Sequence, residues 1–142
     1  MNGRLMSELS DPRGTQRSAW GRFLAGFAYA FRGLWYALRT QRNIRVHTGV
    51  ALLVIVAAVL LRLSATEIAL VAVAIGGVFA SELVNTSIEL CLDLLHPEYH
   101  PLVRAAKDVA AGAVLLSALL AVVIGVCVFG PHLWAWWLTL RR

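Results

Sequence analysis

The sequence predicts an all-α integral membrane protein with three transmembrane helices and an N-terminal amphipathic surface helix. Of its 142 residues, 59% are hydrophobic and only 15% are charged, and a soluble domain of this size could not cover so much apolar surface. The uncharged stretch from Val109 to Phe129 is long enough to cross a bilayer, which needs about 20 residues. A shorter uncharged stretch, Thr48 to Leu61, spans only if His47 and Arg62 reach the two interfaces.

The chain divides into a leader, a membrane domain and a tail. Residues 1–17 contain glycine and proline without apolar periodicity, so we expect a disordered leader and no cleavable signal peptide. The membrane domain covers residues 18–130, with a surface helix over 18–40 and spans at about 46–63, 67–95 and 102–129. We expect Gly130-Pro131 to end the last helix, and the tryptophans and arginines of residues 131–142 to form an interfacial anchor.

Residues 18–40 have the periodicity of an amphipathic helix. Aromatic and leucine side chains recur at three- and four-residue spacing from Trp20 to Leu38, and arginines flank or oppose them. Such a helix can lie on the membrane surface or pack against the spans of its own chain, and the sequence leaves both arrangements open. Arginines interleaved with an apolar stripe indicate lipid headgroups as partners and no nucleic acid.

The second span is expected to begin near Thr66, an acceptable N-cap with Glu67 in the first turn. It runs without a breaker to Leu95, roughly 40 Å at about 1.5 Å per residue, so its last third extends past the hydrocarbon or is buried among helices. Pro97 ends it, residues 96–101 form a loop, and the third span begins near Leu102.

Charge distribution predicts the topology. The chain has 13 basic and 8 acidic residues, and ten of the basic residues lie in segments 1–47 and 96–107. By the positive-inside rule these segments face the cytoplasm. Cys91 and Cys127 fall on different helices, so we expect packing residues rather than a disulfide.

One face of the second span carries a polar stripe. The directions of its four members fall within roughly 80° of one another at helical periodicity; they are Glu82, Asn85, Glu89 and Asp93. A carboxylate at the centre of a membrane helix costs about 2.5 to 3.5 kcal/mol, so an aligned series indicates a function or a partner. The alternative is that the stripe faces water or pairs with arginines outside the bilayer, above all at Asp93.

Lys107 and Asp108 form a second cluster at the start of the third span. Lys107 is the only lysine in the chain, and a compact ammonium on a flexible stem suits a migrating phosphoryl group. One lysine at a cytoplasmic helix end is also what positive-inside topology supplies. Carboxylates for magnesium, an amide and an ammonium together indicate phosphoryl transfer.

Two other kinds of site are excluded by motif. No G-x-x-x-x-G-K-[ST] loop occurs, so a P-loop nucleotide site is absent. The four histidines do not combine with cysteines at zinc-ligand spacing.

Four segments, in this order, resemble the signature of the prokaryotic diacylglycerol kinase family. They are ELVNTSIE at 82–89, Asp93, PEYHP at 97–101 and AKDVAAGAV at 106–114. The resemblance covers roughly residues 20–129. It implies a lipid kinase that moves the γ-phosphate of ATP to the hydroxyl of undecaprenol or diacylglycerol, in lipid carrier recycling or phospholipid metabolism. It also implies a homotrimer in the bacterial inner membrane, with magnesium-dependent sites between neighbouring subunits on the cytoplasmic side.

The resemblance further assigns roles to single residues. Glu82 would be the general base toward the lipid hydroxyl, and Glu89 a magnesium ligand. The nucleotide would be bound by Asn85 and Lys107 at the phosphates and by Asp108 and His100 near the base or ribose. Tyr99 and Arg22 are further nucleotide-binding residues, and Tyr99 and Glu98 would support the loop.

The chain departs from the family pattern at Gln41, where many members have a glutamate that helps to hold the metal. Either the amide oxygen of Gln41 coordinates, or nucleotide phosphates and water complete the shell. The spacing Asn43-x-Arg45-x-His47 is more similar to the undecaprenol kinase branch than to the diacylglycerol branch.

Two other functional classes compete with a kinase. The first is a catalytically silent trimeric membrane module that kept the fold and lost its metal site at position 41. The second is a small channel in which the polar stripe forms a cation ring. The channel gives no reason for the loop and the Lys107-Asp108 pattern. The silent module is opposed by the site residues that remain intact: Glu82, Asn85, Glu89, Lys107 and Asp108.

Overall fold

The computed structural model describes residues 19–141, and the expected all-α fold is confirmed in that part of the chain. Its helices are α2 (Ala19–Thr40), α3 (Arg42–Leu60), α4 (Ala65–Leu95) and α5 (Pro101–Leu140). Three of them, α3, α4 and α5, are long and apolar enough to cross a membrane. The leader expected over residues 1–17 lies outside the described residues.

The chain divides into two units, and the division falls inside α2, between Trp35 and Tyr36. In the first unit, the rings of Trp20 and Phe23 meet edge to face with centroids 5.8 Å apart, and those of Phe23 and Phe27 at 5.1 Å. These contacts follow from the three- and four-residue spacing, which brings side chains together on one helix face. The rings remain exposed, Trp20 by 73%. The position of α2 on a membrane surface stays a prediction.

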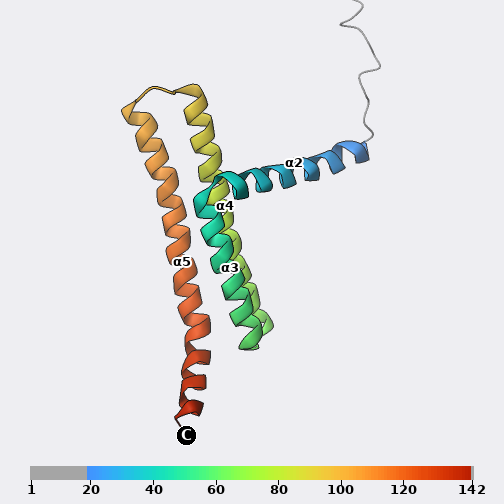
Figure 1. Cartoon of the computed structure of the whole chain (residues 1–142), viewed down its shortest axis with the longest axis vertical. Helices are drawn as coiled ribbons and strands as arrows, with labels where there is room; N and C mark the ends of the chain where they lie inside the picture. Colours follow the sequence, from blue (N-terminus) through green and yellow to red (C-terminus); the bar gives the residue numbers. More distant parts are fainter. Residues whose placement is uncertain (1–18, 142) are drawn as a thin grey trace, which may run out of the picture. The chain divides into compact units, whose positions relative to one another are not determined.

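In the second unit, α3, α4 and α5 run side by side in alternating directions (Figure 1). Within the described residues, α4 packs against both of the other helices, whereas α3 and α5 do not pack on each other. A core of small and branched side chains joins the three helices near the α3–α4 turn: Ala58, Leu63, Val71 and Val128. Large apolar side chains point away from the unit, among them Leu53 and Val73, which are 72% and 71% exposed. An apolar exterior of this extent is suited to a lipid solvent.

The turn from α3 to α4 is closed by a Schellman motif. Arg62 adopts a left-handed conformation with φ of 54°, and the amide of Leu63 donates to the carbonyl of Ala58 at 3.1 Å. Leu63 and Ala58 then meet in the core, the apolar contact that accompanies this motif.

The N-terminus of α4 differs from the expectation, because Ser64 rather than Thr66 is the N-cap. The amide of Glu67 donates to Oγ of Ser64 at 3.4 Å, and the amide of Ser64 donates to Oε2 of Glu67 at 2.8 Å. This reciprocal pair is a capping box, and it satisfies two backbone donors that a cap at Thr66 would leave open. The expected cap at Thr66 was therefore wrong. The spacing of Ser64 and Glu67, which is typical of a capping box, was available in the sequence as a signal for the correct cap.

The α4–α5 connection is as short as expected. α4 ends at Leu95 before Pro97, and α5 begins at Pro101, one residue before the predicted start. His100 is the N-cap of α5, because its Nδ1 accepts the amide of Leu102 at 3.2 Å. Proline at the first helical position needs no amide partner, which explains why the helix starts there.

The expected end of the last helix at Gly130-Pro131 is wrong, because α5 continues through Pro131 to Leu140. Proline removes one backbone hydrogen bond, but membrane helices tolerate it where other groups bond to the freed carbonyls. Pro131 cannot donate to the carbonyl four residues earlier, that of Cys127. The ring of His132 bonds through Nδ1 to the next carbonyl, that of Val128, at 3.0 Å. Beyond it, the rings of Trp134 and Trp137 stack with centroids 5.1 Å apart. The tail is therefore the last part of α5.

Candidate active site

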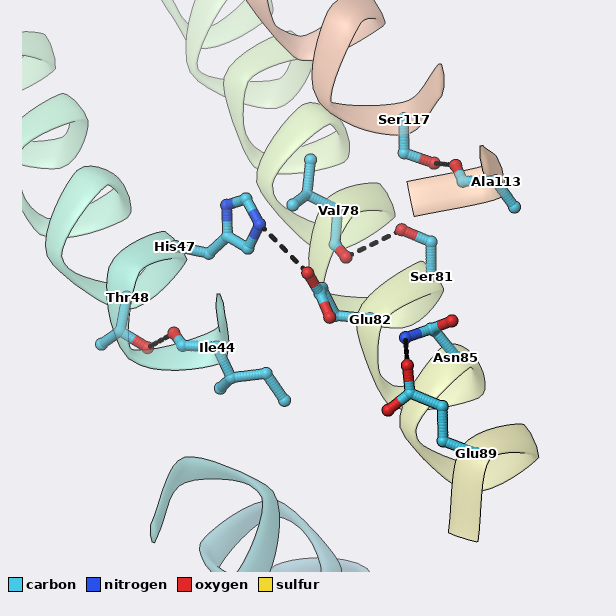
Figure 2. Close-up of polar contacts among 10 residues, drawn as sticks. All are labelled: Ile44, His47, Thr48, Val78, Ser81, Glu82, Asn85, Glu89, Ala113 and Ser117. Carbon is cyan, nitrogen blue, oxygen red and sulfur yellow. Dashed lines mark hydrogen bonds and ion pairs between the residues drawn. The ribbon is translucent and has the colours of Figure 1, made fainter. Parts of the chain in front are cut away.

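Glu82 is the most enclosed polar residue of the described part of the chain, with 2% of its surface exposed. Its Oε1 lies 3.3 Å from Nε2 of His47, which reaches it from α3 (Figure 2). The surrounding helices are apolar, and a buried carboxylate is tolerated where a hydrogen-bond donor faces it. The sequence predicted that Glu82 has a partner or a use, and the structure supplies the partner.

Sequence reasoning missed His47 as a site residue and placed it only at a membrane interface. Helical periodicity shows which residues share a face of one helix, but it does not show which residue of another helix lies opposite. The one available signal was the Asn43-x-Arg45-x-His47 spacing, which was used only to compare branches of a family. The contact itself depends on how α3 packs against α4.

Asn85 and Glu89 continue the polar stripe along α4. Nδ2 of Asn85 donates to Oε1 of Glu89 at 2.9 Å (Figure 2). Oδ1 of Asn85 is buried and has no hydrogen-bond partner among the described residues. A buried carbonyl oxygen without a donor is costly and requires an explanation, such as a ligand that completes the site.

Asp93, the last member of the stripe, is in contact with Lys107 across the α4–α5 pair, where Nζ of Lys107 bonds to Oδ1 of Asp93. The two groups proposed from separate segments of the sequence thus lie together. Asp93 pairs with this lysine and not with an arginine, in contrast to the alternative considered above. The contact is exposed to solvent at Asp93, so the lysine is free to exchange this partner for another anion.

The other expected nucleotide contacts are spread over loop and helix ends. Tyr99 is 76% exposed, and the rings of His96 and His100 lie 6.4 Å apart in the α4–α5 loop. Asp108 is exposed beside Lys107 on α5. Arg22 is exposed on α2, in the unit that ends at Trp35, which has no defined placement against the second unit.

Gln41 precedes α3 as its N-cap residue, half-buried, and its side chain does not cap the helix. In the described part of the chain, no three histidine, cysteine, aspartate or glutamate side chains come together as a metal site. The oxygens that fit a hard cation best are the carboxylate of Glu89 and the unpartnered Oδ1 of Asn85. Oδ1 points away from Glu89, because Nδ2 of the same amide faces that carboxylate (Figure 2). A carboxylate such as Glu89 fits magnesium, which keeps much of its shell for water and phosphate.

An apolar groove of about 390 Å³ runs between α3 and α5, and residues of α4 also line it. Its volume is within the range of sites for small ligands, roughly 300 to 1,000 Å³. His47 is its single polar lining residue; the others are aliphatic or aromatic, among them Val50, Phe79 and Val122. The groove therefore reaches the histidine that contacts Glu82.

Comparison with known proteins identifies the family. A model described as "Prokaryotic diacylglycerol kinase" matches residues 28–129. The undecaprenol kinase of Bacillus subtilis (strain 168) is 42% identical over 117 residues, which cover 82% of this chain and 95% of that protein. The chain belongs to the prokaryotic diacylglycerol kinase family.

Other members of the family are also similar. The diacylglycerol kinase of Synechocystis sp. is 44% identical over 122 residues, covering 83% of this chain and 70% of that protein. The diacylglycerol kinase of Escherichia coli (strain K12) is 29% identical over 111 residues, covering 78% of this chain and 91% of that protein.

The resemblance found in the sequence is thus confirmed, and with it the expected class of enzyme. The chain is a lipid kinase, and lipid kinases use ATP as phosphoryl donor. Its prokaryotic family and its three membrane-length helices make it a bacterial membrane protein. A catalytically silent module of the same fold is not favoured.

Proposed function

We propose that this chain transfers the γ-phosphate of ATP to the hydroxyl of a polyprenol of the undecaprenol type, at a site centred on Glu82. The observation that carries the proposal is the position of one buried carboxylate. Glu82 contacts His47, which lines the apolar groove, and lies one helical turn before Asn85 of the Asn85–Glu89 pair. A group that accepts a proton from a lipid alcohol must meet an apolar substrate on one side and a phosphoryl group on the other.

Glu82 acts as the general base. As the lipid oxygen attacks the γ-phosphorus, its proton passes to the carboxylate, which is the role of a base within hydrogen-bond reach of the nucleophile. Oε1 of Glu82 is occupied by His47, so Oε2 is the oxygen that receives the proton. Low exposure keeps water from competing with the lipid hydroxyl for this carboxylate.

Glu89 would hold magnesium, with Gln41 as a further ligand or with water in its place. When bound, magnesium would neutralise part of the negative charge on the phosphates. The role of Asn85 follows from its geometry, since its amide nitrogen fixes Glu89 and its carbonyl oxygen is left for another group. The second hydrogen of Nδ2 is the donor with which Asn85 contacts the phosphates.

Lys107 binds the phosphates. To do this, its ammonium group breaks its contact with Asp93. The base or ribose of the nucleotide lies near Asp108 and His100, and Tyr99 and Arg22 are further nucleotide-binding residues. Exposed ion pairs are worth little, so the exchange of Asp93 for a phosphate is not opposed by a large energy. The exposure of the α4–α5 loop leaves its side chains accessible to ATP.

The working enzyme is a homotrimer in the inner membrane with its active sites between subunits on the cytoplasmic side. The basic segments before α3 and between α4 and α5 support this orientation. α2 lies on the cytoplasmic membrane surface, and its exposed aromatic residues enter the interface. Glu89 is only half-buried in a single chain, so a neighbouring subunit can complete the metal-binding part of the site.

Undecaprenol is preferred to diacylglycerol for two reasons. The Bacillus subtilis relative named undecaprenol kinase is matched over 95% of its length, against 70% for the Synechocystis diacylglycerol kinase. The residues Asn43, Arg45 and His47 also have the spacing of that branch. The test is the ratio of kcat/KM for undecaprenol to kcat/KM for diacylglycerol, measured with the purified full-length chain in mixed micelles. A ratio above one supports the proposal, and a ratio below one reverses the substrate assignment.

A further inference from the structure

The contact between His47 and Glu82 points to a role that the family comparison does not assign. We propose that His47 is a positioning residue, which holds Oε1 of Glu82 so that Oε2 faces the lipid hydroxyl. This inference rests on the proposed function of Glu82 as base. It deepens that function, because it names the residue that orients the base.

The first argument is the set of polar contacts that Glu82 makes. Its carboxylate is 2% exposed, so water contributes little to its orientation. In the part of the chain that the structure describes, the imidazole of His47 is the partner of this carboxylate, with Nε2 3.3 Å from Oε1. A glutamate side chain has three rotatable bonds, and without this contact nothing polar fixes the direction of its oxygens.

The second argument is the chemistry of the ring. With a proton on Nε2, the ring donates toward Glu82 and does not accept from the substrate through that nitrogen. His47 is thereby unsuited to remove the proton of the lipid itself while the contact lasts. It acts through Glu82, in the way that an orienting group supports a base in other catalytic constellations.

The third argument is the place of His47 in the groove. Its side chain is 26% exposed and is the polar residue in an otherwise apolar lining. Figure 2 shows the ring on α3 pointing across to Glu82 on α4. A lipid whose chain follows the groove would bring its hydroxyl to this polar end, where the orientation of Glu82 decides whether the reacting atoms align. Misplacement of a reacting group by about 1 Å can cost on the order of 100-fold in rate.

The experiment combines two substitutions at His47 with one at Glu82. His47→Ala removes the donor, whereas His47→Gln keeps an amide N–H that can reach the carboxylate. Both are measured as full-length protein in the wild-type and the Glu82→Gln backgrounds, for kcat, KM for ATP, KM for undecaprenol and thermal stability. His132→Ala is the matched control, because it removes a histidine that lies 3.8 Å from Glu67 at the other end of α4.

We expect His47→Ala to lower kcat by roughly 10- to 100-fold with KM for ATP unchanged. His47→Gln should recover a large part of this loss, and His132→Ala should keep wild-type kcat. In the Glu82→Gln background, His47→Ala should cause no further loss, because two residues that act as one unit are not additive.

Three results would overturn the inference. They are wild-type kcat in His47→Ala, an equal loss in both backgrounds, and a loss that His47→Gln does not relieve although its melting temperature is unchanged. Failure of the proposed function gives a different result, namely wild-type turnover in Glu82→Gln itself. If Glu82→Gln is inactive and His47→Ala is fully active, the base stands and only its positioning by His47 is wrong.

Discussion

Asn85 donates a hydrogen bond of 2.9 Å from Nδ2 to Oε1 of Glu89, one turn away on α4, while its own Oδ1 is buried without a partner among the described residues. One end of the amide is thus used to orient a carboxylate, and the other end is left for a group that donates or carries positive charge. This arrangement makes Glu89, which Asn85 orients, the best candidate for a metal ligand in the site.

Glu89→Gln should reduce lipid phosphorylation by roughly 100-fold or more while expression and oligomer formation remain normal. The substitution keeps the side-chain volume and an oxygen that can accept from Asn85, but it removes the charge that attracts magnesium. The measurements are kinase activity and size-exclusion chromatography of the purified variant. Loss of the oligomer would assign Glu89 a structural role instead.

Glu82→Gln should lower kcat by roughly 100- to 10,000-fold, the usual contribution of a general base. ATP affinity should be nearly unchanged, because the base acts on the lipid hydroxyl and not on the nucleotide. Titration with a fluorescent ATP analogue measures binding separately from turnover. A comparable loss of nucleotide affinity would contradict the assignment of Glu82.

Gln41→Glu should decrease the magnesium concentration needed for half-maximal activity by about 3- to 10-fold, on the scale of about 1 kcal/mol for an added charge near a cation. A second carboxylate near Glu89 attracts the divalent ion more strongly than a neutral amide does. The measurement is a magnesium titration of kinase activity in three proteins: the wild type, Gln41→Glu, which adds a charge at position 41, and Gln41→Ala, which shortens the side chain. If the midpoint is the same in all three, position 41 lies outside the metal shell.

Asp93→Asn should lower KM for ATP by up to about 5-fold. The reason is that Lys107 no longer has to break an ion pair with a carboxylate before it binds the phosphates. The effect is small since Asp93 is 65% exposed and its ion pair is screened by water. Steady-state kinetics at two salt concentrations test this, and the difference between the proteins should shrink at the higher one. An increase in KM would mean that Asp93 itself supports the bound nucleotide.

Ser64→Ala should destabilise the protein by about 1 kcal/mol, because it removes the acceptor of the capping box. Thr66→Ala is the matched control, as Thr66 lies inside the first turn and does not cap the helix. Both variants should keep kinase activity, since the turn is far along α4 from the polar stripe. Thermal unfolding in detergent should show a lower midpoint for Ser64→Ala alone. A lower midpoint for Thr66→Ala alone would mean that Thr66 is the N-cap, as expected from the sequence.

The sequence predicted the helices of the membrane domain because their signals are local. Uncharged runs identified the three membrane-length helices, and Pro97 and Pro101 marked the connection between α4 and α5. The alignment of Glu82, Asn85 and Glu89 followed from helical periodicity, and the burial of Glu82 and Asn85 agrees with the use inferred for the stripe. These features depend on residues close together in one helix.

The features that the sequence did not reveal depend on neighbours in space. The contact of His47 with Glu82 requires the packing of α3 on α4, and the contact of Lys107 with Asp93 requires that of α5 on α4. Pro131 was read as a helix end because proline breaks soluble helices, but a membrane helix has no water to replace its backbone bonds and therefore continues. The rule that proline ends a helix holds in water, and the membrane as solvent is the reason that it does not hold at Pro131.

The most direct test of phosphoryl transfer uses ATP labelled either at the γ- or at the α-phosphate. The purified chain is incubated with undecaprenol, magnesium and each form of ATP, beside the Glu82→Gln variant. Label should appear in the lipid from γ-labelled ATP and not from α-labelled ATP, and the variant should transfer roughly 100-fold less or lower still. Absence of labelled lipid with both undecaprenol and diacylglycerol, from protein shown to be folded, would contradict the kinase function and favour a silent membrane module.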